Sequence, residues 1–423
     1  MSRKTSQIII AIVIIFLLVG MVAFWFLFMR NTGKSASNSN NGSQNSGFSP
    51  FGRTGGGTQQ GTTTGTGTNS STGSPTVVTV PSLRLLSATP IGGYGASTTA
   101  STTLVRWVDR GRGNVFEASE DSLAITTLSN TLLPKMYESV WSKDLSSFIG
   151  QILDNNNSTV STLYATLSKQ STSTSATPYD LVGKNLPDGI TAYAASPQKD
   201  KIFLFVVQNG TGVGYVAPFT GGTAVQIFST PITEINAEWP ATNTIAITTK
   251  GSAYQQGFLY FVDPKTGAWN KILGPLPGLS TRVSHDAKYV IASVAGNAND
   301  VLTNIYSVAS STTNDAIIRT LADKCAWGNF YEDTVYCATP FQPVSGIYPD
   351  DWYKGTLSTV DKIWEVNAKT GEVHLISSVF IDAKKNIDAY NLGLDDKDNY
   401  LFFMNKVDLS FWSLDLVTAS STP

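Results

Sequence analysis

The sequence predicts an all-β fold, a seven-bladed β-propeller, preceded by one transmembrane helix and a disordered linker. The stretch from Ile232 to Gly278 holds four short runs rich in β-branched and aromatic residues, separated by Gly, Pro, Asn and Asp, as strands and turns are. Similar units follow with a period of about 45 to 50 residues, the length of a propeller blade. The third run of each unit carries an aromatic residue before a turn, and these residues are Phe116, Tyr164, Tyr215, Tyr260, Tyr306, Trp364 and Trp412.

The chain begins with a short tail at residues 1–7 and an unbroken apolar run at residues 8–29. At about 1.5 Å per residue, this run is long enough to cross a hydrocarbon core of about 30 Å. A cleavable signal peptide has an apolar region of only about 7 to 15 residues. Cleavage near the small residues at 35–37 is the alternative, but the length of the run favours a signal anchor in the cell membrane.

The charges beside the apolar run do not decide which end of the chain is cytoplasmic. Arg3 and Lys4 precede the run and Arg30 and Lys34 follow it, so the positive-inside count is a tie. Only 14% of the residues are charged, and Ser, Thr, Gly and Asn fill solvated positions as they do in exported proteins. We therefore expect a cytoplasmic tail at residues 1–7 and an extracellular or periplasmic C-terminal domain on a single-pass anchor.

Residues 30–80 are rich in Gly, Ser, Thr and Asn and contain almost nothing to bury, which predicts a disordered linker. A coil of about 50 residues has an r.m.s. span on the order of 40 Å, so the linker would hold the domain clear of the bilayer. Phe48 and Phe51 are its only aromatic residues. A weak contact with a partner through them is the alternative to a plain spacer.

The repeated units occupy residues 81–418, and residues 419–423 form a C-terminal tail. The run Leu83–Ser87 reads as the fourth strand of a blade but precedes any complete blade, whereas the last unit has only three strands. We therefore expect this N-terminal strand to complete the last blade and close the ring, leaving no edge strand open. Blade six, at about residues 324–378, is longer than the other units.

The turn between the first and second strands of several units carries a shared pattern, which reads ASPQKDKIF, VSHDAKYVI and LDDKDNYLF. These runs resemble the PD40 or WD40-like repeat of TolB-type propellers, whose consensus is roughly Ser-Pro-Asp-Gly-Lys followed by apolar residues. The resemblance covers about residues 81–418 and implies the propeller fold, which hosts many unrelated activities. The layout of anchor, linker and propeller also resembles uncharacterised membrane-anchored bacterial propeller proteins, which implies no activity.

No catalytic, cofactor-binding or metal-binding motif is visible in the sequence. His285 falls in a turn and His374 in an outer strand far along the chain, so we expect structural surface roles rather than a triad or a metal site. The acidic cluster of Asp395, Asp396, Asp398 and Asn399 lacks the spacing of an EF-hand loop. It is predicted to be an ordinary strand turn, with calcium binding as the alternative.

Cys325 and Cys337 flank the predicted hairpin from the first to the second strand of blade six. If Trp327 pairs with Val335, the two cysteines lie opposite each other on one face of the sheet, close enough for a disulfide. An exported domain would oxidise them, whereas two buried free thiols are the alternative. Zinc is excluded because two cysteines with no nearby histidine supply too few ligands.

Blade six has an insertion between its second and third strands. In a propeller such loops emerge on the face of the crossings between blades, which usually carries the binding funnel. We expect this insertion to present an exposed aromatic cluster with a polar rim that binds a ligand, formed by Phe341, Tyr348, Asp350, Asp351, Trp352 and Tyr353. The alternative is a lid, in which nearby prolines pack the aromatic residues over the rim.

Together these features predict a membrane-anchored, surface-displayed binding module for a protein or an envelope ligand, with no cofactor and no enzymatic activity. The formal net charge of −2 provides no basic footprint, so we expect no nucleic-acid partner. One alternative is an extracellular propeller hydrolase or lyase acting on glycan or peptide, with acidic residues gathered around the funnel from several blades. Another is a passive cell-envelope scaffold.

Overall fold

The computed structural model describes residues 80–100, 102–154, 159–170 and 177–419 of the chain. The predicted cytoplasmic tail, the predicted membrane-spanning segment at residues 8–29 and nearly all of the predicted linker lie outside the described residues. Within the described ranges, no helix is both long enough and apolar enough to cross a membrane.

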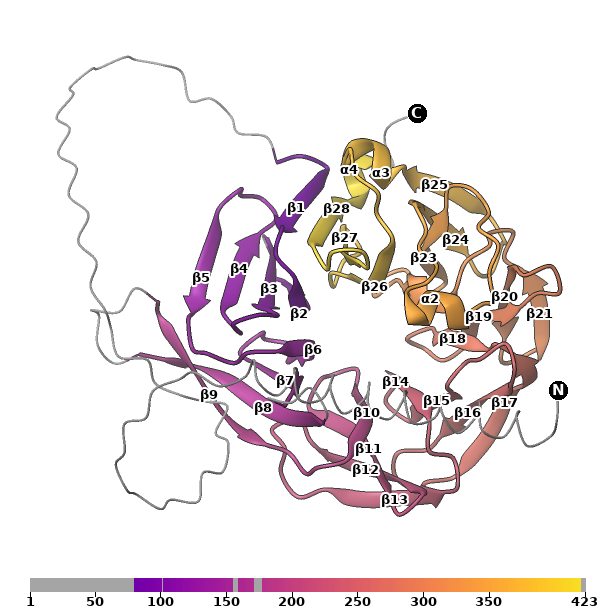
Figure 1. Cartoon of the computed structure of the whole chain (residues 1–423), viewed down its shortest axis with the longest axis horizontal. Coiled ribbons are helices and arrows are strands. Elements are labelled where there is room, and N and C mark those ends of the chain that lie inside the picture. Colours follow the sequence, from indigo (N-terminus) through magenta and orange to yellow (C-terminus); the bar gives the residue numbers. More distant parts are fainter. Residues whose placement is uncertain (1–79, 101, 155–158, 171–176, 420–423) are drawn as a thin grey trace, which may run out of the picture. The chain divides into compact units, whose positions relative to one another are not determined.

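Seven four-stranded antiparallel sheets are arranged around a common centre (Figure 1). Blade one consists of β2 (Ile91–Thr98), β3 (Thr103–Asp109), β4 (Val115–Ser119) and β5 (Ile125–Ser129). Blade two consists of β6 (Met136–Trp141), β7 (Ser147–Leu153), β8 (Val160–Lys169) and β9 (Tyr179–Asn185). Blade three consists of β10 (Ile190–Ala195), β11 (Lys201–Gln208), β12 (Thr211–Pro218) and β13 (Val225–Thr230).

The next three blades repeat this plan. Blade four consists of β14 (Ile235–Ala241), β15 (Thr244–Thr249), β16 (Gln256–Val262) and β17 (Trp269–Pro277). Blade five consists of β18 (Ser280–Val283), β19 (Tyr289–Ala295), β20 (Val301–Ser307) and β21 (Thr312–Asp315). Blade six consists of β22 (Cys325–Trp327), β23 (Thr334–Pro340), β24 (Asp361–Asn367) and β25 (Val373–Ser377).

Blade seven is completed by the first strand of the propeller. β26 (Ala389–Leu394), β27 (Tyr400–Asn405) and β28 (Phe411–Asp415) follow chain order, and β1 (Leu83–Ser87) pairs antiparallel with β28. Leu85 lies opposite Trp412 in this pairing. The structure thus confirms the predicted seven blades and the closure of the ring by the N-terminal strand.

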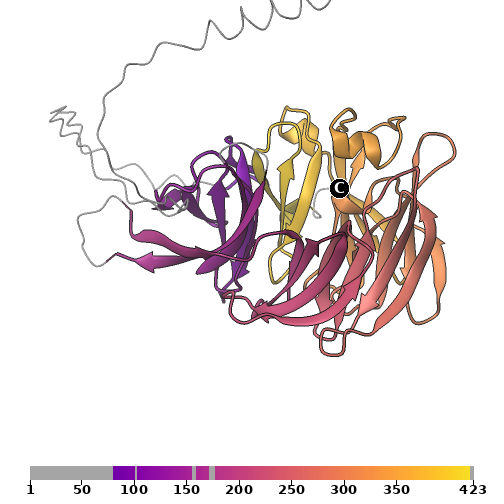
Figure 2. The ribbon, with the colours of Figure 1, turned by 60° about the horizontal axis from the view of Figure 1, so that its bottom comes forward.

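The described part of the chain also contains four short helices: η1 (Ala322–Lys324), α2 (Asp350–Lys354), α3 (Val379–Asp382) and α4 (Leu416–Ala419). In the side view the strands run between the two faces of the ring (Figure 2). The β23 to β24 insertion, which contains α2, and the α3 connection to blade seven emerge on the same face, because both follow strands of the same direction in an antiparallel sheet. We call this the insertion face.

The hydrophobic core lies between neighbouring blades. β11 is buried on both sides, and its alternate residues enter two different clusters. Ile202 and Leu204 pack toward blade two, whereas Phe203 and Phe205 pack toward blade four. This alternation follows from the two-residue period of a strand, and it explains why second strands read as continuous apolar runs.

The closing strand is also held by a buried polar contact. Arg84 of β1 donates to the Ser119 carbonyl at 2.9 Å, and its guanidinium lies 3.9 Å from the Glu120 carboxylate. Glu120 accepts a hydrogen bond from the Ser413 hydroxyl of β28 at 3.0 Å. Burial raises the pKa of Glu120 to about 7, an effect that Arg84 partly opposes.

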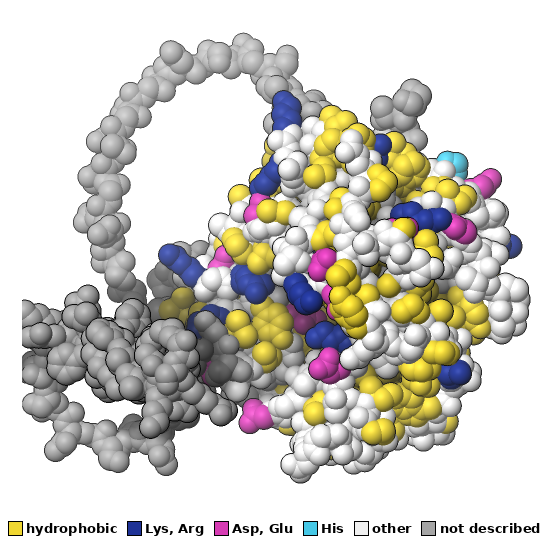
Figure 3. Space-filling model, turned by 45° about the vertical axis from the view of Figure 1, so that its right-hand side comes forward, with side chains coloured by type: hydrophobic (Ala, Val, Ile, Leu, Met, Phe, Trp, Pro, Cys, Tyr) yellow, Lys and Arg dark blue, Asp and Glu magenta, His cyan; other side chains and the backbone are white. Residues whose placement is uncertain are grey.

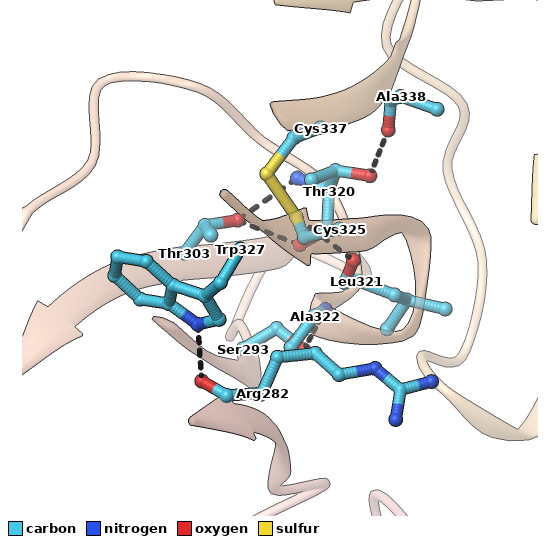
Figure 4. Close-up of a disulfide and its surroundings, with 10 residues drawn as sticks. All are labelled: Arg282, Ser293, Thr303, Thr320, Leu321, Ala322, Cys325, Trp327, Cys337 and Ala338. Carbon is cyan, nitrogen blue, oxygen red and sulfur yellow. Dashed lines mark hydrogen bonds between the residues drawn. A yellow bond between two sulfur atoms is a disulfide. The ribbon is translucent and has the colours of Figure 1, made fainter. Parts of the chain in front are cut away.

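Cys325 and Cys337 form a disulfide between the first two strands of blade six (Figure 4). The two cysteines are direct partners in the β22 to β23 register, and Trp327 lies opposite Val335, as predicted. The Trp327 indole donates to the Arg282 carbonyl at 3.0 Å and so links the disulfide hairpin to blade five (Figure 4).

Candidate ligand-binding funnel

A cavity of about 380 Å³ lies where the innermost strands of several blades converge, and we call it the funnel. Its wall includes Gly92 and Gly93 of β2, Tyr137, Glu138 and Ser139 of β6, Arg282 of β18, and Tyr390 and Asn391 of β26. Arg110, Asp323, Trp352 and Met404 complete it. The space-filling view shows acidic and basic side chains side by side near the middle of the molecule (Figure 3).

Two glycines allow the first two blades to approach closely at the funnel wall. A Cβ atom on Gly93 would lie 2.4 Å from Ser139 Oγ, and one on Gly92 would lie 2.4 Å from Met136 Cγ. Gly93 also has a φ of 130°, which side chains disfavour. The sequence Gly-Gly at the start of β2 is therefore required to bring β2 against β6.

Several charged groups of the funnel are already paired within the protein. Arg282 forms an ion pair with Glu238 of β14 at 3.0 Å, and Glu238 also accepts the Val283 backbone N–H at 3.0 Å. Asp323 accepts the Tyr353 hydroxyl at 3.0 Å and also the Ser280 hydroxyl. These contacts fix one side of the funnel, from blade four to blade six.

Two charged groups of the funnel have no partner. Glu138 and Arg110 make no side-chain hydrogen bond or ion pair with another residue in the described ranges. The Glu138 side chain is exposed where it lines the funnel. Desolvation by the surrounding walls raises its pKa, and Arg282 partly opposes this shift. Burial likewise raises the pKa of Tyr390 to about 12, with Arg110 acting in the opposite direction.

The insertion of blade six packs into this region through Trp352. Its side chain is only 4% exposed, and its indole N–H lies 3.2 Å from both carboxylate oxygens of Asp388. Lys406 Nζ lies 4.9 Å from the centre of the Trp352 ring. Tyr348 is also 4% exposed and donates to the Val344 carbonyl at 2.8 Å.

The expectation of one exposed aromatic cluster is therefore wrong. Tyr348 and Trp352 belong to a buried cluster with Tyr353 at its edge, because the large rings find both apolar contacts and a buried partner for the indole N–H. Phe341 is 46% exposed and instead packs against Phe380, with a ring separation of 5.0 Å. The observed packing corresponds to the lid alternative.

The two aspartates of the insertion hold it in place. Asp350 accepts the Ser252 hydroxyl at 2.9 Å and the Ala253 backbone N–H at 2.7 Å, which ties the insertion to the second loop of blade four. Asp351 accepts the Ile347 backbone N–H at 2.8 Å. The structure thus brings Trp352 to the funnel wall and Tyr353 to Asp323, but it leaves Phe341, Asp350 and Asp351 outside the funnel.

The other candidate groups occupy structural positions. His285 lies in the turn from β18 to β19 and His374 in β25, and both are exposed. Asp398 accepts the backbone N–H groups at 329–331 at 2.8 to 3.0 Å, so the acidic cluster stabilises a turn of blade six. No group of three or more His, Cys, Asp or Glu residues suited to a metal ion occurs in the described part of the chain.

The charged residues of the funnel escaped the sequence prediction because they come from separate blades. A local signal could have found three of the charged residues in or beside the funnel, although not Arg110, which lies in the turn after β3. Glu138, Glu238 and Arg282 are charged residues inside innermost strands. A charge at such a position faces the centre of the ring.

No family model matches the chain, and no curated protein matches it. Similar solved structures include TolB from Acinetobacter baumannii, with 10% identity, 74% of this chain, 63% of that chain and a TM-score of 0.42. An oligogalacturonate lyase in complex with manganese has 9% identity over 77% of this chain and 96% of that chain, with a TM-score of 0.48. The Cps50 (Swd1) β-propeller domain of Myceliophteria thermophila has 8% identity over 79% of this chain and 99% of that chain, with a TM-score of 0.47.

TolB is thus among the structural neighbours, as the resemblance of the repeats predicts. This chain spans less than two thirds of the length of that TolB. At these identities and TM-scores the similarity concerns the propeller fold, and it assigns neither a ligand nor a reaction to this chain.

Proposed function

We propose that the protein is a membrane-anchored, surface-displayed binding module that takes a protein or envelope ligand into the funnel. The observation that carries the proposal is the pair of unpartnered charges, Glu138 and Arg110, in the wall of a concave site. Charged groups that line a cavity and have no partner among the described residues are available to an oppositely charged or hydrogen-bonding ligand. A concave site with a few convergent polar groups is the usual form of a binding site.

The groups of the funnel indicate the chemistry of the ligand. Glu138 suits an amine or hydroxyl donor, and Arg110 suits a carboxylate or another acceptor. Trp352 and Tyr390 add aromatic surface to the same wall. The cavity of about 380 Å³ has room for a few residues of a polar peptide or glycan but not for a folded domain. We therefore favour a segment of a larger protein or envelope polymer.

The cellular location in this proposal rests on the sequence and on the cysteines. The apolar run at residues 8–29 and the polar stretch at residues 30–80 would anchor and space the propeller. The disulfide between Cys325 and Cys337 supports a domain outside the cytoplasm, because such bonds persist in oxidising compartments.

The test is a selection of ligands by the full chain in detergent micelles, from a displayed peptide library and from an array of cell-envelope glycans. Ligands selected by the wild type should bind Glu138→Gln or Arg110→Gln on the order of tenfold more weakly, since each loses a charge-assisted hydrogen bond. The controls Glu372→Gln and Arg319→Gln remove exposed charges on outer segments and should bind as the wild type does. Ligands that bind all four variants equally would place binding outside the funnel.

An extracellular hydrolase or lyase acting on glycan or peptide is the second candidate. A carboxyl group with a raised pKa, such as Glu138, suits general acid catalysis, and Glu238 and Asp323 supply further carboxylates in or beside the funnel. Both of these are already paired, which favours binding over catalysis. Cleavage of a selected ligand by the wild type but not by Glu138→Gln would establish the enzymatic alternative, and selection of no ligand would leave the passive scaffold.

A further inference from the structure

A buried cluster of three ionisable side chains lies between blades six and seven. The ammonium nitrogen of Lys324, at the end of η1, lies 2.6 Å from Asp388 Oδ1 and 2.8 Å from Asp361 Oδ2. The Lys324 side chain is 2% exposed, and those of Asp361 and Asp388 are 0% exposed. An amine and two carboxyl groups are therefore held in contact with water excluded, where the cost of isolated charge is high.

Asp388 is surrounded by hydrogen-bond donors. Besides Lys324, it accepts the Trp352 indole N–H at 3.2 Å, the Ser358 hydroxyl at 2.9 Å and the Thr359 hydroxyl at 3.0 Å. Burial alone would raise the pKa of Asp388, but Lys324 and these donors together hold it below its ordinary value. Asp388 is the ionised partner of Lys324.

Asp361 differs from Asp388 because one of its carboxyl oxygens has no hydrogen-bond partner. Its Oδ2 accepts the Ala389 backbone N–H at 2.7 Å, whereas its buried Oδ1 has no hydrogen-bond partner. Burial raises the pKa of Asp361, and Lys324 only partly opposes this shift. Of the two carboxyl groups beside Lys324, Asp361 is therefore the one whose surroundings favour the protonated form.

We propose that Lys324 and Asp361 form an intramolecular isopeptide bond, with Asp388 as the proton acceptor. A lysine amine is a nucleophile once its proton is removed, and a neutral carboxyl group is the electrophile that it can attack. The geometry supplies the amine, the acceptor and the electrophile in one pocket, so the reaction needs no further reactant. Holding reacting groups in contact in this way replaces the activation that free carboxyl groups require.

The reaction can be followed atom by atom. Asp388 takes a proton from the Lys324 ammonium, and the freed Nζ attacks Cγ of Asp361. The Ala389 N–H stabilises the charge that develops on Oδ2. The bond from Cγ to Oδ1 then breaks, and Oδ1 leaves as water with its own proton and a second one from Nζ. The amide nitrogen keeps the third ammonium proton, Asp388 keeps the first, and nothing is oxidised or reduced.

The bond would reinforce the base of the insertion. It would join the residue before Cys325 to the first residue of β24, while the disulfide joins β22 to β23. Two covalent links would then hold the first three strands of blade six, on either side of the chain segment that carries Trp352. The insertion would then stay packed against the funnel wall even when the surrounding strands are partly destabilised.

The test is peptide mass mapping of the full chain purified from the cells that make it. We expect a linked pair of peptides, one containing Lys324 and the other Asp361, with a mass lower than their sum by one water, about 18 Da. Separate peptides of unmodified mass from folded wild-type protein would overturn the proposal. A link to Asp388 instead of Asp361 would overturn the roles assigned to the two aspartates.

Variants distinguish a loss of the bond-forming reaction from a loss of folding. Lys324→Arg keeps the positive charge but cannot form the amide, and Asp388→Asn keeps the shape but accepts no proton, so both should yield only unlinked peptides. The control Asp382→Asn changes an exposed aspartate of the neighbouring α3 and should remain fully linked. Linked peptides from Asp388→Asn at the wild-type yield would contradict the role of Asp388, whereas the wild-type measurement stands even if a variant does not fold.

Discussion

At the residue scale, the properties of this propeller depend on a few charged side chains placed where water is scarce. Glu138, Glu120 and Asp361 are all carboxyl groups whose pKa burial raises, yet their surroundings differ. Glu138 faces an open funnel and is available to a ligand. Glu120 and Asp361 face partners within the protein, so they bear on stability rather than on binding.

Glu120 makes the stability of the ring depend on pH. Its pKa rises from 4.5 to about 7 on folding. Between these values the unfolded chain has released the proton that the folded protein still holds, so the free energy of unfolding falls as the pH rises through this range. We expect the thermal midpoint of Glu120→Gln to fall less than that of the wild type between pH 5 and pH 8. An unchanged pH dependence in this variant would contradict the assignment, and Glu372→Gln serves as the control.

Trp352 is a packing residue as well as a wall of the funnel. Because it is buried and its indole N–H contacts Asp388, Trp352→Ala should lower the free energy of unfolding by about 3 kcal/mol. Phe341→Ala, at an exposed ring of the same insertion, should cost much less. Denaturant unfolding of the two variants measures the difference. Equal effects would mean that Trp352 lies on an open loop, as the sequence alone suggested.

At the element scale, local sequence patterns were enough for the strands and for their pairing across blade six. The turn residues, the aromatic positions and the orphan run at the N-terminus predicted seven blades and their closure. The path of the insertion was not predictable in the same way. Its aromatic residues suit an exposed patch and a buried cluster equally well, and the choice depends on Asp388, which lies in a different blade.

The strand β1 is predicted to be essential for the stability of the ring. A chain that begins after Ser87 lacks the fourth strand of blade seven and leaves β28 with an open edge. It also loses the contact of Arg84 with Ser119. We expect its thermal midpoint to fall by on the order of 10 °C, whereas a chain that begins after Pro75 should melt as the longer protein does. Equal melting of the two chains would show that β1 does not close the ring.

At the scale of the whole molecule, the fold could be predicted from the sequence but the funnel could not. Strands and turns depend on residues that are close in the sequence, so each blade can be predicted from its own stretch of chain. The funnel forms only when the ring closes, because Glu138 of β6, Arg282 of β18 and Tyr390 of β26 meet at the centre from distant parts of the chain. The spacing of these residues along the sequence does not indicate that they meet in the folded protein.

The orientation of the whole chain is open to a direct test. If the propeller lies outside the cytoplasmic membrane, an added protease should degrade it in intact spheroplasts while a cytoplasmic marker protein survives. The disulfide of blade six supports this location, because the cytoplasm keeps thiols reduced. Protection of the propeller until the membrane is dissolved would place it inside and would remove the surface-displayed part of the proposal.

Photo-cross-linking in living cells would show whether a ligand binds in the funnel. A photoreactive phenylalanine analogue would replace Tyr390 in the funnel wall or, in the control, the exposed Phe330 in a turn on the opposite face. We expect a specific adduct from position 390 that disappears when Glu138 is also changed to Gln, and no such adduct from position 330. Adducts that form equally at both positions, or that persist with Glu138→Gln, would contradict this expectation.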